Sequence, residues 1–374
     1  MIPAYRYKER LARLPELVWE SGLDALLVGV GPDLEYLTGY RAMPLERLTM
    51  LVVPARGEPR LVVPRLERAA AEAELRTEVV LATWGETDEP YAVVLEDVPP
   101  GTVALAVSDR LWASHLLRLQ AARPEAGWSA ASAVLRGLRM VKDPDEIEFL
   151  RRAAHAADRV VAQIAAGRLI GRTEADVARE VRERLLAEGH QEAHFAIVGS
   201  GPNSASPHHE ASERVIQPGE PIVLDIGGTL EGYGSDITRT LWVTGGDPAR
   251  GPDDDFRRLF ELVREAQAEG ASAARPGVPA ERVDDIAHRI IEAGGHGEHF
   301  IHRLGHGIGL EGHEEPYLVA GNSEPLEIGN AFSIEPGIYL EGRYGARIED
   351  IVVCGPDGPI VLNEAPRDLY VVDG

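Results

Sequence analysis

The strongest constraint on this chain is a pair of apolar strands, residues 221–243, each of which carries one carboxylate. The stretch reads PIVLDIGGTLEGYGSDITRTLWV, and its glycine-rich turn TLEGYG predicts a hairpin. A turn centred on Leu230 and Glu231 would place Asp225 opposite Asp236, with Cβ atoms about 4.5–5.5 Å apart. Two half-buried like charges repel at that distance, and a bound cation is the simplest way to stabilise them. The alternative is a solvated hairpin face with two unrelated acids.

A second hairpin, within NAFSIEPGIYLEGRYGARIEDIVVC, repeats this arrangement. Glu335 and Glu349 lie on its two strands at positions symmetric about Gly342, and Pro336-Gly337 predicts a bulge beside Glu335. His306 is flanked by glycines in GHGIGLEGH, which let the backbone approach its neighbours closely. Four carboxylates and one imidazole together predict two divalent cations. We expect Mn²⁺ or Co²⁺ ahead of Zn²⁺ or Fe²⁺ for this mixture of oxygen and nitrogen donors.

Composition limits the partners and the compartment. The 374 residues are enough for two domains, and 44% hydrophobic with 26% charged residues is typical of globular proteins. A formal charge of −23 disfavours nucleic acid, because phosphate binding needs clustered positive charge. We expect no membrane span and no signal peptide, since no apolar run is long enough. Cys354 is the only cysteine, which excludes an intrachain disulfide and a thiolate metal site and favours the cytoplasm.

The order of elements predicts two domains. Residues 1–130 alternate helices and strands, which indicates an α/β domain over 1–135. The second domain, 136–374, opens with Asp143-Pro144-Asp145-Glu146, the pattern of a capping box with proline at the first helical position. Thr173 caps the next helix. The order helix, helix, strand and hairpin then occurs a second time, so we expect an α+β domain with an internal pseudo-twofold duplication.

Several motifs of the second domain resemble one known family. VLDIGG, GYGSDITRT, GHGIGLEGHEEP, SIEPGIY and ARIEDIV match, in order and spacing, the pita-bread metallopeptidases of family M24. This family includes prolidases, aminopeptidases P, methionine aminopeptidases and creatinases. In the first domain, DALLVGVGPDLEYLTGY resembles the creatinase and prolidase N-terminal domain, and LRMVKDPDEIEFLRRA resembles the junction between the domains. The resemblance implies a creatinase-type N-terminal domain followed by a pita-bread catalytic domain.

The resemblance also implies a set of metal ligands and a general base. Asp236 and Glu349 would bridge the two ions, and Glu335 would act as the base beside a bridging hydroxide. The complete implied ligand set is Asp225, Asp236, His306, Glu335 and Glu349.

Further residues match positions that contact substrate in this family. His208, in the loop SGPNSASPHH, would hydrogen-bond the substrate amide and support its leaving nitrogen, with the adjacent His209 as the alternative. His313 would hold the oxygen of the scissile carbonyl. His302 and Arg347 match positions that contact the substrate or its carboxylate, the alternative being ordinary salt-bridged or solvated side chains. Supporting or pocket-shaping roles fall to Tyr233, Tyr339 and Tyr317.

An Xaa-Pro dipeptidase (prolidase) is the function that the resemblance favours, with a hydroxide between two divalent ions attacking the bond before a C-terminal proline. Aminopeptidase P, which releases the N-terminal residue of longer Xaa-Pro peptides, is the nearest alternative. Hydrolysis of another small C–N substrate on the same fold is a further one. The expected partners are proline-containing dipeptides or short peptides. Relatives with this N-terminal domain are commonly homodimers, so we expect a homodimer.

Overall fold

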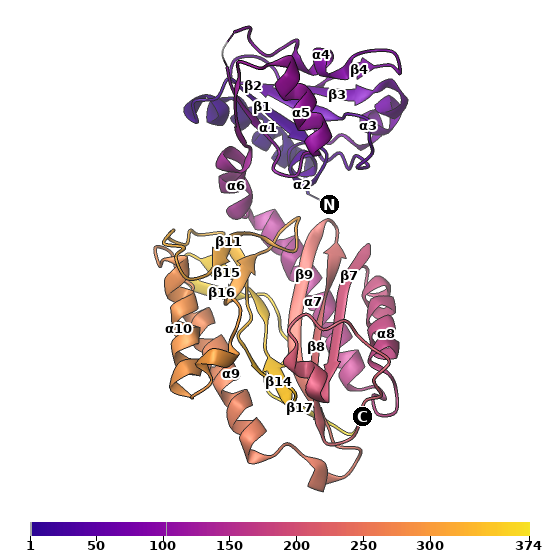
Figure 1. The fold of residues 1–374 in the computed structure, drawn as a ribbon, viewed down its shortest axis with the longest axis vertical. Coiled ribbons are helices and arrows are strands. Elements are labelled where there is room, and N and C mark those ends of the chain that lie inside the picture. Colours follow the sequence, from indigo (N-terminus) through magenta and orange to yellow (C-terminus); the bar gives the residue numbers. More distant parts are fainter. Residues whose placement is uncertain (1, 102) are drawn as a thin grey trace. The chain divides into compact units, whose positions relative to one another are not determined.

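The computed structural model describes residues 2–101 and 103–374, which form two compact units, Met1–Arg139 and Met140–Gly374 (Figure 1). The sequence placed the boundary between residues 135 and 136, whereas the structure divides at the end of the helix Ser132–Met140 (α6). Within the described residues, none of the helices is both long enough and apolar enough to cross a membrane.

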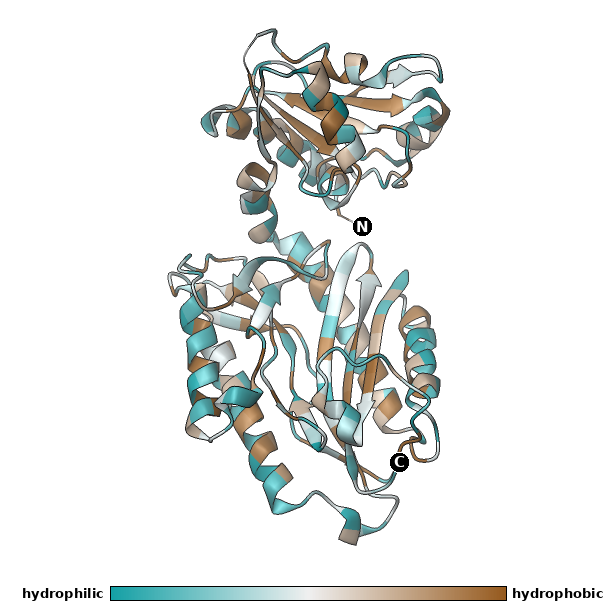
Figure 2. Cartoon of the chain, viewed as in Figure 1, coloured by the Kyte–Doolittle hydropathy of each residue, from teal (hydrophilic) through white to brown (hydrophobic). Residues whose placement is uncertain are grey.

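The first unit is built on one mixed sheet with the strand order β4-β3-β2-β1-β5-β6. β1 is antiparallel to β2 and parallel to β5. The inner strands contain apolar runs such as ALLV and MLVV, which are brown in Figure 2, and they are buried along their whole length. Its elements are α1 (Ala4–Glu20), β1 (Ala25–Gly29), α2 (Pro32–Thr38), β2 (Met50–Pro54), β3 (Arg60–Pro64), α3 (Arg68–Glu74), β4 (Val80–Trp84), α4 (Pro90–Leu95), β5 (Ala104–Val107), α5 (Ala113–Ala122) and β6 (Gly127–Ala130).

The second unit combines helices with antiparallel strands. Its first half contains α7 (Pro144–Ala165), α8 (Glu174–Ala187), β7 (Glu192–Ser200), the 3₁₀ turn η2 (Gly201–Ala205), β8 (Glu220–Leu230) and β9 (Tyr233–Val243). Its second half contains α9 (Asp254–Ala273), α10 (Ala280–Ala293), β10 (Gly305–Gly307), β11 (Glu314–Leu318), β12 (Ala331–Ile334), β13 (Gly337–Leu340), β14 (Tyr344–Arg347), β15 (Asp350–Gly355), β16 (Gly358–Val361) and β17 (Tyr370–Val372).

The two helices that open this unit begin where the sequence predicts. The Asp143 carboxylate accepts hydrogen bonds from the backbone N–H groups of Asp145 and Glu146, at 2.9 and 3.0 Å, and the Glu146 carboxylate accepts from the Asp143 N–H at 3.0 Å. This is the expected capping box. The Thr173 hydroxyl accepts from the Asp176 N–H at 3.1 Å and begins α8.

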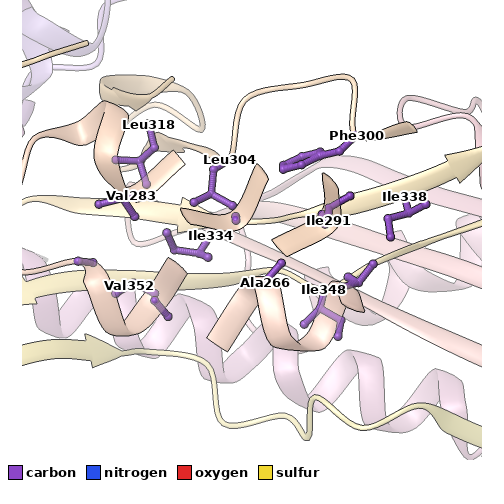
Figure 3. Close-up of a cluster of buried hydrophobic side chains, with 14 of the residues drawn as sticks. Ala266, Val283, Ile291, Phe300, Leu304, Leu318, Ile334, Ile338, Ile348 and Val352 are labelled. Carbon is purple, nitrogen blue, oxygen red and sulfur yellow. The ribbon is translucent and has the colours of Figure 1, made fainter. Parts of the chain in front are cut away.

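The expected duplication is present. In each half two helices precede an antiparallel sheet, with strand order β17-β9-β8-β7 in the first half and β11-β10-β12-β15-β16 in the second. Figure 1 shows α7 and α8 beside the first sheet and α9 and α10 beside the second. The apolar sides of α9 and α10 pack on the second sheet, where Figure 3 shows their side chains meeting those of the strands. The labelled members of this core are Ala266, Val283, Ile291, Phe300, Leu304, Leu318, Ile334, Ile338, Ile348 and Val352.

The register predicted for the first hairpin was wrong by two residues. Asp225 lies opposite Thr238, and Asp236 lies opposite Gly227. The cause is the turn, which consists of Glu231 and Gly232 with φ values of 51° and 91°. A tight turn with both central residues in the left-handed region matches the twist of the strands, and its centre lies one residue later than the Leu230–Glu231 centre that we assumed. Because the shift is an even number of residues, both aspartates still face the same side of the sheet.

The second hairpin has the expected register but not a continuous pair of strands. Ile334 pairs with Asp350 and Gly337 pairs with Arg347, both symmetric about Gly342. At the predicted irregularity the ladder is interrupted, so that β12 and β15 belong to the large sheet while β13 and β14 form a separate ribbon. Glu335 lies in this interruption, where the bend turns its side chain out of the regular alternation.

A candidate metal centre and catalytic cleft

Five side chains from both halves of the second unit converge on one point. Asp225 and Asp236 come from β8 and β9, and His306 comes from β10. Glu335 directly follows β12, and Glu349 directly precedes β15. Donor atoms of Asp225, Asp236 and Glu349 lie within 4.8 Å of one another, and so do those of His306, Glu335 and Glu349. These are the ligands that the sequence predicts.

The backbone around His306 fixes the direction of its ring. A Cβ atom on Gly305 would lie 1.9 Å from the Ser333 carbonyl oxygen, so only glycine permits this close approach of strands. The Nδ1 atom of His306 lies 3.1 Å from the Gly307 carbonyl oxygen, which makes Nδ1 the protonated nitrogen. The Nε2 atom is therefore a free electron-pair donor, 3.3 Å from a Glu335 oxygen and 3.7 Å from an Asp236 oxygen.

Asp225 is only half satisfied by protein groups. Its Oδ2 atom accepts a hydrogen bond from Nη2 of Arg347 at 2.5 Å. Its Oδ1 atom is buried and has no hydrogen-bond partner within the described residues. A buried carboxylate oxygen without a donor is costly unless a cation binds it. Asp225 lies beside Asp236 and Glu349, so the observation fits a metal ligand.

The electrostatics of the cluster also fit divalent cations. Burial, together with the charges of Asp225 and Glu335, raises the pKa of Asp236 well above its usual range. Burial and the charge of Asp236 do the same to the pKa of Glu349. Burial raises the pKa of Glu335 to about 7, and burial lowers the pKa of His306 to about 3. The site thus disfavours several ionised carboxylates together, a repulsion that bound cations would offset, and it keeps the imidazole neutral, as metal binding requires.

The cluster forms the floor of a cleft of about 920 Å³. His313 stands beside His306, with the two rings stacked at a centroid distance of 3.7 Å. His208 also lines the cleft. His209 does not, because its Nε2 atom lies 2.7 Å from a carboxylate oxygen of the buried Glu174. Of the two adjacent histidines, His208 is thus the one that the loop presents to the cleft, in line with the preference stated from the sequence.

The remaining predicted contact residues form a chain of hydrogen bonds along the cleft wall. The two ring nitrogens of His302 lie 2.8 Å from the Arg303 carbonyl oxygen and 2.9 Å from the Tyr339 hydroxyl. Arg347 donates to the same hydroxyl at 2.9 Å. Tyr233 has a different position: its hydroxyl donates to a Glu146 oxygen at 3.0 Å, on α7.

Comparison with known proteins agrees with this geometry. Residues 148–356 match the profile described as metallopeptidase family M24, and residues 10–141 match the creatinase/prolidase N-terminal domain. The chain belongs to metallopeptidase family M24. It is 47% identical over 369 residues to the probable dipeptidase PepE of Mycobacterium tuberculosis, covering 98% of this chain and 96% of that protein.

Solved structures of M24 peptidases superpose on the whole chain. The dipeptidase PepE of Mycobacterium ulcerans has a TM-score of 0.93 and 45% identity, covering 99% of both chains. A recombinant prolidase of Thermococcus sibiricus has a TM-score of 0.90 and 35% identity, covering 98% of this chain and 99% of that chain. The pita-bread architecture expected from the motifs is therefore the fold of this M24 peptidase.

Two residues that sequence reasoning missed form hydrogen bonds with the candidate ligands. The Thr238 hydroxyl donates to a Glu349 oxygen at 2.8 Å and accepts from Nε of Arg347 at 3.0 Å. The Ser333 hydroxyl donates to Glu335 at 3.1 Å and accepts from the His306 N–H at 3.1 Å. A signal for Thr238 was available, since it lies two residues after Asp236 and so on the same face of β9. Ser333 has the same spacing from Glu335, but the interruption of the ladder at Glu335 breaks the alternation, so this contact was not predictable.

Proposed function

We propose that this M24 peptidase is an Xaa-Pro dipeptidase that cleaves the bond before a C-terminal proline. The observation that carries the proposal is the convergence of the five ligand side chains with His208 and His313 in one cleft. The relatives named dipeptidase and prolidase, which match the chain over nearly its full length, support the same substrate class. A cleft of about 920 Å³ has room for a dipeptide.

The acids and His306 would hold two divalent ions, which supply a Lewis acid for the scissile carbonyl and lower the pKa of bound water. Side chains of the protein would carry out the proton transfers and stabilise the developing charge. Glu335, which lies in the ligand cluster 3.3 Å from Nε2 of His306, would take a proton from the attacking water and pass it on. His313 would donate a hydrogen bond to the carbonyl oxygen as negative charge develops there. His208 would hydrogen-bond the amide and assist the departure of the proline nitrogen.

The proposal is tested with purified protein loaded with Mn²⁺ or Co²⁺ and offered Ala-Pro, Ala-Ala and Ala-Pro-Ala. An Xaa-Pro dipeptidase cleaves Ala-Pro far faster than the other two. Faster cleavage of Ala-Pro-Ala would replace the proposal with aminopeptidase P, and equal cleavage of Ala-Ala would indicate a general dipeptidase. Loss of all three activities despite bound metal would favour another small C–N substrate.

The ligand set has its own test. In Asp225→Asn we expect the metal content to fall below that of the wild type and Ala-Pro hydrolysis to drop at least a hundredfold. Asp357→Asn, in an exposed turn of the same unit, is the matched control and keeps both. Full metal content together with full activity in Asp225→Asn would refute the ligand assignment.

We further propose that each subunit binds two metal ions, with a preference for Mn²⁺ or Co²⁺. The proposal also includes a homodimer and a cytoplasmic location. Metal analysis of protein purified without added metal checks the first two. Light scattering of the same sample checks the homodimer.

A further inference from the structure

Arg303 is a cationic residue of the cleft that neither the motifs nor the ligand cluster explain. It lies between His302 and Leu304 on the segment that leads into β10, is half-buried, and lines the same cleft as His306 and His313. The guanidinium therefore belongs to the same cleft as the candidate ligand cluster.

The two residues predicted to contact the substrate carboxylate already have protein partners. Both ring nitrogens of His302 lie within hydrogen-bond distance of an oxygen, from the Arg303 backbone and from Tyr339. All three nitrogens of the Arg347 guanidinium also have acceptors, and its side chain is almost completely buried. These acceptors are Thr238 Oγ1 at 3.0 Å, Tyr339 Oη at 2.9 Å, the Pro207 carbonyl oxygen at 3.3 Å and Asp225 Oδ2 at 2.5 Å.

The Arg303 guanidinium, in contrast, has no hydrogen bond and no ion pair with any of the described residues. It packs over the ring of Tyr317, with its Cζ atom 4.3 Å from the ring centroid. Stacking on an aromatic face fixes the plane of a guanidinium and leaves its N–H edge available. An N–H edge of this kind matches a carboxylate, which it can bind with two parallel hydrogen bonds.

We propose that Arg303, held by Tyr317, receives the C-terminal carboxylate of the peptide substrate. This inference rests on the proposed function. Arg303 would be the group that restricts the enzyme to dipeptides. In a dipeptide the carboxylate is separated from the scissile nitrogen by one carbon atom, so a cation on the cleft wall can reach it while the scissile bond lies over the ligands. In a longer peptide that position holds a neutral amide, which gains no ion pair.

The test compares Ala-Pro with its C-terminal amide, because the amide lacks the negative charge of the C-terminal carboxylate. In Arg303→Met we expect kcat/KM for Ala-Pro to fall about ten- to a hundredfold, chiefly through KM, because a charge-assisted hydrogen bond is lost. For Ala-Pro amide the same substitution changes kcat/KM by less than about threefold. Arg303→Lys, which keeps the charge but not the fork, retains part of the preference.

Arg343→Met is the matched control, since Arg343 also lies over a tyrosine ring, that of Tyr344 at 4.9 Å, but does not line the cleft. We expect it to leave both substrates unaffected. An equal loss on Ala-Pro and its amide in Arg303→Met overturns the proposal, as does an unchanged KM for Ala-Pro.

Failure of the proposed function is recognised separately in the wild-type protein with bound metal, which would then cleave neither compound, or would cleave Ala-Pro-Ala or Ala-Ala at least as fast as Ala-Pro. Calorimetric binding of Ala-Pro and its amide decides the role of Arg303 in that case. Weaker binding of Ala-Pro alone in Arg303→Met supports the proposal, and unchanged or equally weakened binding rejects it.

Discussion

Arg347 and Asp225 form a buried ion pair, Nη2 to Oδ2 at 2.5 Å, although Asp225 also offers its other oxygen to the ligand cluster. The pair places one permanent positive charge among the acids of the site. It is also the largest electrostatic influence opposing the burial that raises the pKa of Asp225. Arg347 thus limits the repulsion that the protein must overcome before any cation binds.

Arg347→Met should therefore destabilise the metal-free protein more than the metal-loaded protein. Removing one partner of a buried ion pair costs about 3–5 kcal/mol, and bound cations would replace much of the lost charge. Urea unfolding with EDTA and with excess Mn²⁺ measures the two losses. Arg343→Met, at an exposed site, should change neither. Equal destabilisation in both conditions would contradict this reading of the pair.

Metal should stabilise the protein more at about pH 8 than at about pH 5. Burial raises the pKa of Glu335 to about 7, and the pKa values of Asp236 and Glu349 are also raised. Their unfolded values are near 4, so the folded metal-free protein holds extra protons and loses stability as the pH rises from about 4 towards 7. Metal binding needs the deprotonated ligands. The increase in Tm on adding Mn²⁺, measured at both pH values, is the test, and a smaller increase at the higher pH would be the opposite result.

His208 and His209 should separate into one catalytic and one structural residue. His208→Ala is expected to lower kcat about a hundredfold or more, the range for general acid–base groups, with little change in Tm. His209→Ala removes a donor to the buried Glu174 and should lower Tm, with a smaller effect on kcat in the folded fraction. The reverse pattern would exchange the two assignments.

Glu174 should be required for the loop that carries His208. Its fully buried carboxylate accepts hydrogen bonds from Ser200, Asn203, His209 and Ser212, several at 2.7 Å. Burial alone would raise the pKa of Glu174, but the hydrogen bonds from Ser212, Ser200 and His209 outweigh it and lower the pKa to about 2.

In Glu174→Gln an amide group would face some of these donors, so we expect a loss of about 2–3 kcal/mol in unfolding free energy. Faster proteolysis within residues 200–214 should accompany it. Glu180→Gln is the control on the same helix, because Glu180 is only partly buried and pairs with Arg172 and Arg184. Similar proteolysis of the two variants would argue against a role of Glu174 in holding the loop.

The convergence of the candidate ligands was predictable because they lie in local patterns, whereas long-range packing was not. Two acids on each hairpin, and glycines around His306, are visible within short stretches of sequence. The predicted register of the first hairpin was wrong by two residues, but the prediction that Asp225 and Asp236 share one face of the sheet was unaffected, because the shift is even.

The contacts that long-range packing creates could not be predicted from the sequence. The stacking of Arg303 on Tyr317 depends on β10 and β11 lying side by side. The attachment of Glu174 to the His208 loop joins a helix to a segment that no periodicity links to it. Such contacts depend on the three-dimensional path of the chain, and residue type alone does not reveal them.

The bridge between Thr238 and Glu349 has a consequence for how the protein matures. The two residues pair across the two halves of the second unit, with the Glu349 N–H donating to the Thr238 carbonyl oxygen at 3.1 Å. Neither half carries all five candidate ligands, so under the proposed function a nascent chain would acquire its affinity for cations only when the halves have docked. Cation uptake would then draw the equilibrium towards the docked state. In a growing or refolding chain, metal capture would therefore act as a checkpoint that marks completed assembly.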